Sequence, residues 1–79
     1  MSEFFVSRDR KLVIGALRKL GLSLKDGSRH TKAECISNKN KTTIPRHSKI
    51  KREIVNSVCD FLIKKNYDKE KLKNFLKIR

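Results

Sequence analysis

The first quarter of the chain has the apolar spacing of an amphipathic helix. Apolar residues recur at alternating steps of one and three positions, which gathers five of them on one helical face: Leu12, Val13, Ala16, Leu17 and Leu20. Ser7 is a candidate N-cap, and Gly21 is a candidate stop because glycine readily adopts the left-handed conformation. The pattern therefore predicts a helix over Arg8–Leu20.

Short strand patterns follow this helix. Leu22 and Leu24 alternate with polar residues, and Asp26–Gly27 is a turn signal. Further on, Thr42–Ile44 is β-branched and predicts another strand. Pro45 should end that strand, because proline cannot donate a hydrogen bond to a ladder.

Between these two strands, the segment Arg29–Ile36 alternates small residues with charged or polar ones. This alternation puts Thr31, Ala33 and Cys35 on one face of a strand, and the other face then carries His30, Lys32 and Glu34. A polar loop, Ser37–Asn40, leads to the next strand. We predict a three-stranded antiparallel meander.

The second half of the chain predicts two helices. The first covers Lys49–Lys65, with an apolar face made of Ile50, Ile54, Val55, Val58, Cys59, Phe61 and Leu62. Asn66 is a candidate stop, and Asp68 can cap a short last helix whose inward residues would be Leu72, Phe75 and Leu76. No repeat or linker interrupts residues 1–79, so we expect one α+β domain. Its order is α-β-β-β-α with an extra C-terminal helix, and its helices cover one face of a three-stranded antiparallel sheet.

The net charge of the chain indicates what kind of partner it binds. The chain has 21 Lys and Arg against 8 Asp and Glu, a formal net charge of +13. So many like charges repel one another in a compact domain, and an anionic partner would relieve that repulsion. Nucleic acid is the first candidate, because phosphate neutralisation supplies most non-specific affinity. An anionic membrane, an acidic protein, or basicity that serves only solubility are the alternatives.

The two cysteines and the scattered carboxylates argue against metal chemistry. Cys35 and Cys59 form no CxxC or CxxH spacing, so no zinc site is expected, and both lie in apolar-periodic segments. We therefore expect two buried, reduced thiols in a cytoplasmic protein, although a disulfide stays open. Asp9, Asp26 and Glu34 fall on separate elements, unlike the clustered carboxylates of metal-dependent nucleases. We expect no metal, no cofactor, no signal peptide and no membrane span.

Four landmarks, in this order and spacing, resemble the HicA family of toxins from toxin–antitoxin systems. They are "LRKLGL" at Leu17–Leu22, "GSRH" at Gly27–His30, "TTIPRH" at Thr42–His47, and the basic amphipathic helix from Lys49 onward. The chain departs from the family in two respects: the segment Tyr67–Arg79 extends beyond the usual short form, and Arg29 separates Gly-Ser from the histidine that often follows it directly. A one-residue shift within a strand turns a side chain to the other face, so the face that His30 occupies decides the match.

The resemblance implies a fold similar to the double-stranded-RNA-binding domain. It also implies a ribonuclease that acts on mRNA and is held silent by a cognate, acidic HicB-like antitoxin. His30 matches the family's catalytic histidine. The residues expected to contact RNA around it are Gly27, Ser28, Arg29, Lys32, Arg46 and His47.

This chemistry is reasonable for the residues present. RNA can be cleaved without metal by its own 2′-OH, provided that an imidazole moves a proton and cations stabilise the phosphorane. Other interpretations stay open. His30 could be an idle exposed strand residue, and His47 could serve a hydrogen bond at the start of the following helix. Lys51 and Arg52 could be a solvated face.

Two other functions fit the same composition. One is a non-catalytic RNA- or DNA-binding module, which turnover would distinguish from a nuclease. The other is a regulator that grips an acidic protein. A membrane-surface role ranks last, because the small core needs both apolar helix faces.

Overall fold

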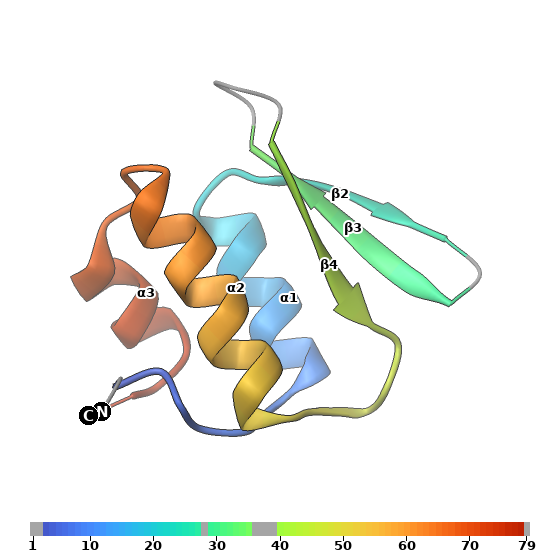
Figure 1. Ribbon diagram of the computed structural model, residues 1–79, viewed down its shortest axis with the longest axis horizontal. Coiled ribbons are helices and arrows are strands. Elements are labelled where there is room, and N and C mark those ends of the chain that lie inside the picture. The colour runs from blue at the N-terminus through green and yellow to red at the C-terminus, as the bar shows by residue number, and fades with distance from the viewer. Residues whose placement is uncertain (1–2, 28, 36–39, 79) are drawn as a thin grey trace.

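The computed structural model describes residues 3–27, 29–35 and 40–78. The fold is α+β, and the predicted order of one helix, three strands and two further helices is confirmed (Figure 1). The elements are β1 (Arg8–Asp9), α1 (Arg10–Lys19), β2 (Ser23–Asp26), β3 (His30–Glu34), β4 (Lys41–Pro45), β5 (Lys49–Ile50), α2 (Arg52–Lys64) and α3 (Lys69–Phe75).

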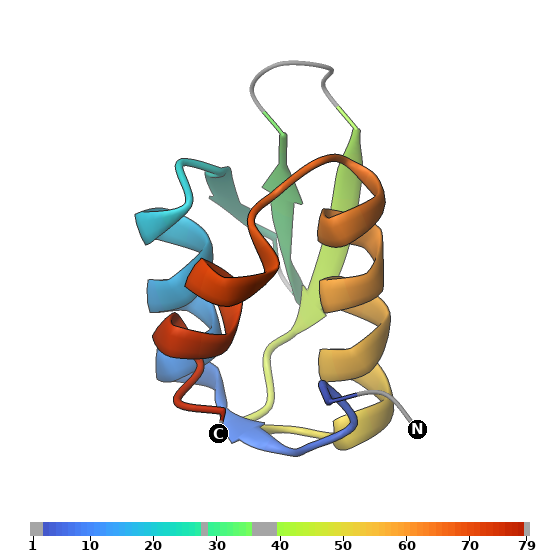
Figure 2. The same cartoon turned by 90° about the vertical axis from the view of Figure 1, so that its left-hand side faces the viewer.

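The elements form three layers. The sheet β2-β3-β4 is the first, α1 and α2 lie against one of its faces, and α3 lies on the far side of these helices (Figures 1 and 2). Leu72 of α3 and its C-cap residue Leu76 are fully buried and pack with α1 and α2 in the core. The sheet therefore has one face covered by helices and one face open.

The strand register sets which side chains reach the open face. Thr31 pairs with Ile44 in the antiparallel ladder of β3 and β4, and both are fully buried against the helices with Ala33. Successive residues alternate between faces, so His30 and Lys32 point away from the helices. Both are exposed, and the predicted division of β3 into an inner and an outer face is confirmed.

Helix α1 ends as predicted. Gly21 has a φ of 90°, and its N–H donates to the Arg18 carbonyl at 3.0 Å. The N–H of Leu22 donates to the Leu17 carbonyl at 3.1 Å, which completes a Schellman motif. A side chain at position 21 would strain this left-handed backbone.

The start of α1 differs from the prediction. The helix begins at Arg10 and not at Arg8, and Asp9 rather than Ser7 is the N-cap residue. The reason is tertiary, because the chain before the helix pairs as strand β1 with the distant strand β5, Arg8 opposite Ile50. The Arg8 guanidinium also donates to the Leu76 carbonyl at 2.9 Å, where the open carbonyls at the end of α3 attract a cation.

The predicted start of α2 is wrong, its predicted end is one residue too late, and the predicted stop at Asn66 is confirmed. Lys49–Ile50 is extended because it pairs with β1, so the helix begins at Arg52. At the other end, Asn66 has a φ of 69° and the Tyr67 N–H donates to the Leu62 carbonyl at 3.1 Å. The Asp68 carboxylate then caps α3 as predicted, accepting from the N–H groups of Glu70 and Lys71 at 2.9 and 3.3 Å.

The core holds both cysteines. Cys35 and Cys59 are fully buried and unpaired, so the predicted buried thiols are confirmed and no disulfide joins them. Burial raises the pKa of the Cys59 thiol to about 12, because a thiolate would be poorly solvated there.

Phe75, expected to point inward, is only partly buried, and the Lys19 ammonium lies 5.4 Å from its ring centre.

The N-terminal segment packs against the core, which the sequence pattern did not predict. Phe4 is buried against the helices. Next to it, the Glu3 carboxylate lies 2.8 Å from the Lys69 ammonium and 2.5 Å from that of Lys73. These contacts fasten the beginning of the chain to α3. No helix in the described part of the chain is long and apolar enough to cross a membrane.

Candidate functional site

The site begins at the tight connection between β2 and β3. The Gly27 N–H donates to the His30 carbonyl at 2.7 Å, which turns the chain back on itself and makes His30 the first residue of β3. A Cβ at position 27 would lie 3.0 Å from that same carbonyl oxygen, so the turn favours glycine. Ser28, expected to contact RNA, lies outside the described residues, and Arg29 is exposed in the turn.

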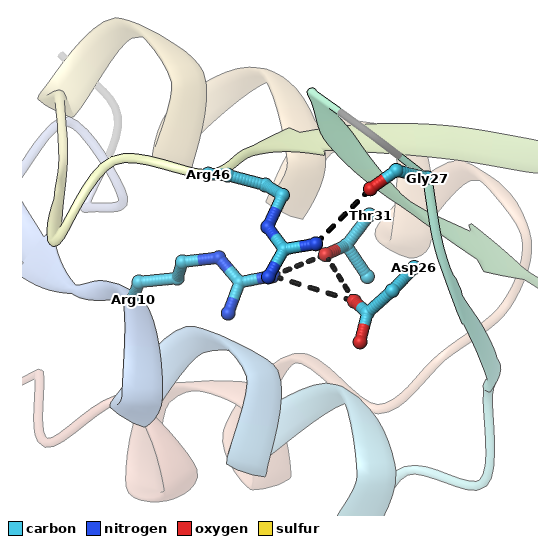
Figure 3. A network of polar contacts seen from close by, with 5 residues as sticks. All are labelled: Arg10, Asp26, Gly27, Thr31 and Arg46. Carbon is cyan, nitrogen blue, oxygen red and sulfur yellow. Dashed lines mark hydrogen bonds and ion pairs between the residues drawn. The ribbon is translucent and has the colours of Figure 1, made fainter.

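A polar network holds the base of this hairpin against α1 (Figure 3). The buried Thr31 hydroxyl donates to the Asp26 carboxylate at 2.8 Å. The Arg10 guanidinium donates to the Thr31 hydroxyl oxygen and lies 3.6 Å from the same carboxylate. The pKa of Asp26 is lowered, first by the hydrogen bond from Thr31 and then by the charges of Arg46, Arg10 and Arg18. The Thr31 hydroxyl thus connects strand β3 to the start of α1.

Arg46 fastens the other side of the hairpin. Its Nη1 donates to the Gly27 carbonyl at 3.0 Å (Figure 3). Arg46 follows the last residue of β4, so this bond connects the segment after β4 with the turn before His30. We expected Arg46 to contact phosphate, and that stays a prediction; the contact within the chain gives the residue a positioning role.

His30 lies between the Asp26–Thr31–Arg10 network and the hydrogen bond from Arg46 to Gly27. It pairs with Pro45 across the β3–β4 ladder and is exposed on the face away from the helices. Its imidazole has no hydrogen-bond partner among the residues that the structure describes. The ring is therefore available to a ligand that approaches the open face.

A groove passes from His30 to the segment before α2. We call it the two-histidine groove; it encloses about 320 Å³ and is lined by His30, Pro45, His47, Lys49, Ile50, Lys51 and Ile54. A second, wider groove continues from it along the exposed edge of β4 toward α2, and it includes Lys32. Both grooves share His30, Pro45 and Ile54, so they form one continuous surface.

The structure brings together some of the expected residues and adds others. His30 and His47 share the two-histidine groove, and Lys32 lies in the adjoining one. Lys49 and Lys51 were assigned to a helix from the sequence, yet they line the groove from extended backbone. The signal for them is an alternation: buried Ile50 stands between two exposed lysines, as in a strand with one face covered.

The groove surfaces are positively charged. Lys32, Lys49 and Lys51 are exposed along them, and among the residues that the structure describes Glu53 is the one carboxylate in either lining. The Glu53 carboxylate lies 3.5 Å from the Arg52 guanidinium, which offsets its charge. Two imidazoles among ammonium groups can exchange protons with an anionic ligand while the lysines stabilise its charge.

Metal ligands do not gather here. Across residues 3–27, 29–35 and 40–78, no group of three or more His, Cys, Asp or Glu side chains could hold a metal ion.

Comparison of the chain with protein-family models, with curated proteins and with solved structures finds no significant match.

Proposed function

We propose that this protein is a HicA-like endoribonuclease. It would cleave mRNA in the cytoplasm without a metal or cofactor, with His30 as a general acid or base, and an acidic HicB-like antitoxin would neutralise it. The observation that carries the proposal is the position of His30. It is an exposed histidine at the first position of β3, its imidazole has no hydrogen-bond partner among the described residues, and it lines a groove bordered by lysines.

The additional residue Arg29 between Gly-Ser and the histidine does not place the His30 side chain in the core. Thr31 takes the inward position, so the neighbouring His30 points to the open face. This is the arrangement that a catalytic residue needs, because a nucleic acid can reach an exposed sheet face without unfolding the domain.

The chemistry follows from the groups at the groove. A neutral imidazole removes the proton of a ribose 2′-OH, and that oxygen then attacks the adjacent phosphorus. The grooves that would hold the RNA are bordered by Lys32, Lys49 and Lys51. Their ammonium groups stabilise the charge that develops on the phosphorane oxygens. The expected products are a 2′,3′-cyclic phosphate and a 5′-hydroxyl, because the attacking nucleophile belongs to the RNA and not to water.

Charge also supports the expected partner. A net charge of +13 favours an acidic protein as strongly as it favours RNA. An antitoxin that inhibits by occlusion would cover His30 and the lysines of the two-histidine groove. Co-expression with such a partner should relieve growth arrest caused by the protein alone.

Product analysis tests the proposal. The purified protein is incubated with a single-stranded RNA of mixed sequence in EDTA, and the fragment ends are determined. Fragments with cyclic phosphate ends support the nuclease. Salt-sensitive binding without fragments would instead support the non-catalytic nucleic-acid-binding module.

A further inference from the structure

We propose that His47 is a second catalytic residue, and that it divides the two proton transfers of RNA cleavage with His30. The inference rests on the proposed function, and it changes the role expected for His47 from RNA contact to acid–base chemistry. Its basis is that two imidazoles from separate segments line one groove of about 320 Å³.

The strand pairing explains why the two histidines line the same groove. His30 stands opposite Pro45 in the β3–β4 ladder, and His47 follows Pro45 by two positions. The ladder therefore brings the start of β3 to the segment that carries His47. A phosphate bound in this groove would lie among His30, His47 and Lys49, which all line it.

The backbone on both sides of His47 is held in place. Before it, the Arg46 side chain donates to the Gly27 carbonyl at 3.0 Å. After it, the Ser48 carbonyl accepts a hydrogen bond from the Arg10 N–H at 2.9 Å. Gly27 lies in the turn before His30, so one contact fixes the two histidine-bearing segments relative to each other. Such preorganisation is what proton transfer between fixed groups requires.

The structure also removes the simpler explanation of His47. A residue that serves the start of α2 would hydrogen-bond to the first turn of that helix. The N-cap residue is instead Lys51, whose carbonyl accepts from the Ile54 and Val55 N–H groups, and the His47 side chain has no hydrogen-bond partner in the described chain. His47 is exposed and lines the two-histidine groove.

The proton transfers balance as follows. One histidine, neutral at the start, takes the 2′-OH proton while O2′ forms a bond to phosphorus. The P–O5′ bond breaks, and the other histidine, protonated at the start, gives its proton to O5′. The products are a 2′,3′-cyclic phosphate and a 5′-hydroxyl, and the two rings have exchanged protonation states. No metal, oxidant or other reactant is consumed.

A pH–rate profile tests this division. Single-turnover cleavage rates in EDTA are measured for the wild type, His30→Ala, His47→Ala and Ser48→Ala. Two acting histidines predict a bell-shaped wild-type profile, and each histidine variant should lose one limb and about 10²- to 10⁴-fold in rate. Ser48→Ala is the matched control, because its exposed side chain lies beside His47 but outside the two-histidine groove, and it should keep the bell shape.

A modified substrate identifies the acid. At the cleavage site found with the wild type, sulfur replaces the bridging 5′ oxygen; a thiolate leaves without a proton. This substrate should restore the rate of one histidine variant and not of the other. Restoration of both or of neither overturns the proposal, as does a His47→Ala variant that cleaves ordinary RNA at the wild-type rate. A wild type that cleaves nothing overturns the proposed function itself, so the two failures are distinguishable.

Discussion

Arg46 and Gly27 are joined by a hydrogen bond of 3.0 Å from the guanidinium Nη1 to the turn carbonyl. This contact holds the hairpin that presents His30 against the segment that carries His47. The Asp26–Thr31–Arg10 network fastens the same hairpin to α1 from the other side (Figure 3). The groove is thus framed by polar contacts whose removal should loosen it while leaving the apolar core in place.

Replacing Arg46 with alanine should weaken the frame. The variant loses one exposed charge-assisted hydrogen bond, so the free energy of unfolding should fall by about 1 kcal/mol or less. RNA cleavage should fall by a larger factor than this stability loss explains, because both histidine-bearing segments lose a shared anchor. Urea unfolding and single-turnover rates measure the two effects. Lys11→Ala also removes an exposed cation and is the control; an equal loss of rate there would assign the effect to charge alone.

The buried Thr31 hydroxyl should be more important for stability than its size suggests. Thr31→Val keeps the volume but removes the group that donates to Asp26 and accepts from Arg10. The unfolding free energy should fall by about 1–3 kcal/mol, because a buried polar network loses its central member. Chemical denaturation of both proteins measures this difference. A valine variant as stable as the wild type would mean that the network contributes nothing to the fold.

Acid should release the N-terminal segment. The hydrogen bonds from Lys69 and Lys73 hold the pKa of Glu3 down at about 2, and the carboxylate of the unfolded chain titrates near 4.5. A lowered folded-state pKa contributes stability above the unfolded value, and this contribution is lost as the pH falls from about 4.5 toward 2. Glu3→Gln should therefore show a flatter fall in unfolding free energy across that range than the wild type. Identical pH profiles would contradict the ion pairs.

The two thiols should be protected until the chain unfolds. Both cysteines are fully buried, and burial raises the pKa of Cys59 to about 12 from an ordinary value of 9.0. A raised thiol pKa contributes stability below pH 9 that is lost as the pH rises toward 12. A thiol reagent at pH 8 should label neither Cys35 nor Cys59 in the native protein and both in urea, as mass spectrometry can show. Fast labelling of the native protein would contradict the packing.

Local signals made much of the fold predictable. Gly21, Asn66 and Asp68 end or begin helices through hydrogen bonds within a few residues, so sequence patterns capture them. The alternation from His30 to Cys35 likewise predicts which side chains meet the helices, because a strand has a period of two. These same rules placed His30 on an exposed strand face.

What sequence could not predict depends on distant contacts. The alternation around Ile50 is too short to predict extended structure by itself, and Lys49 is a strand residue because Asp9 pairs with it from the N-terminal segment. Arg46 shows the same limit, since its contact with Gly27 exists only once β4 has paired with β3. The two-histidine groove needs both contacts, so His47 could be proposed as a phosphate contact but not as a partner of His30.

The most direct test of the account is the cleavage rate of His30→Ala on single-stranded RNA in EDTA. His30 is exposed, so the variant should unfold at the wild-type urea concentration and bind RNA with the same salt dependence. We predict that its single-turnover rate constant is about 10²- to 10⁴-fold below that of the wild type. A folded His30→Ala protein that cleaves RNA as fast as the wild type would contradict it.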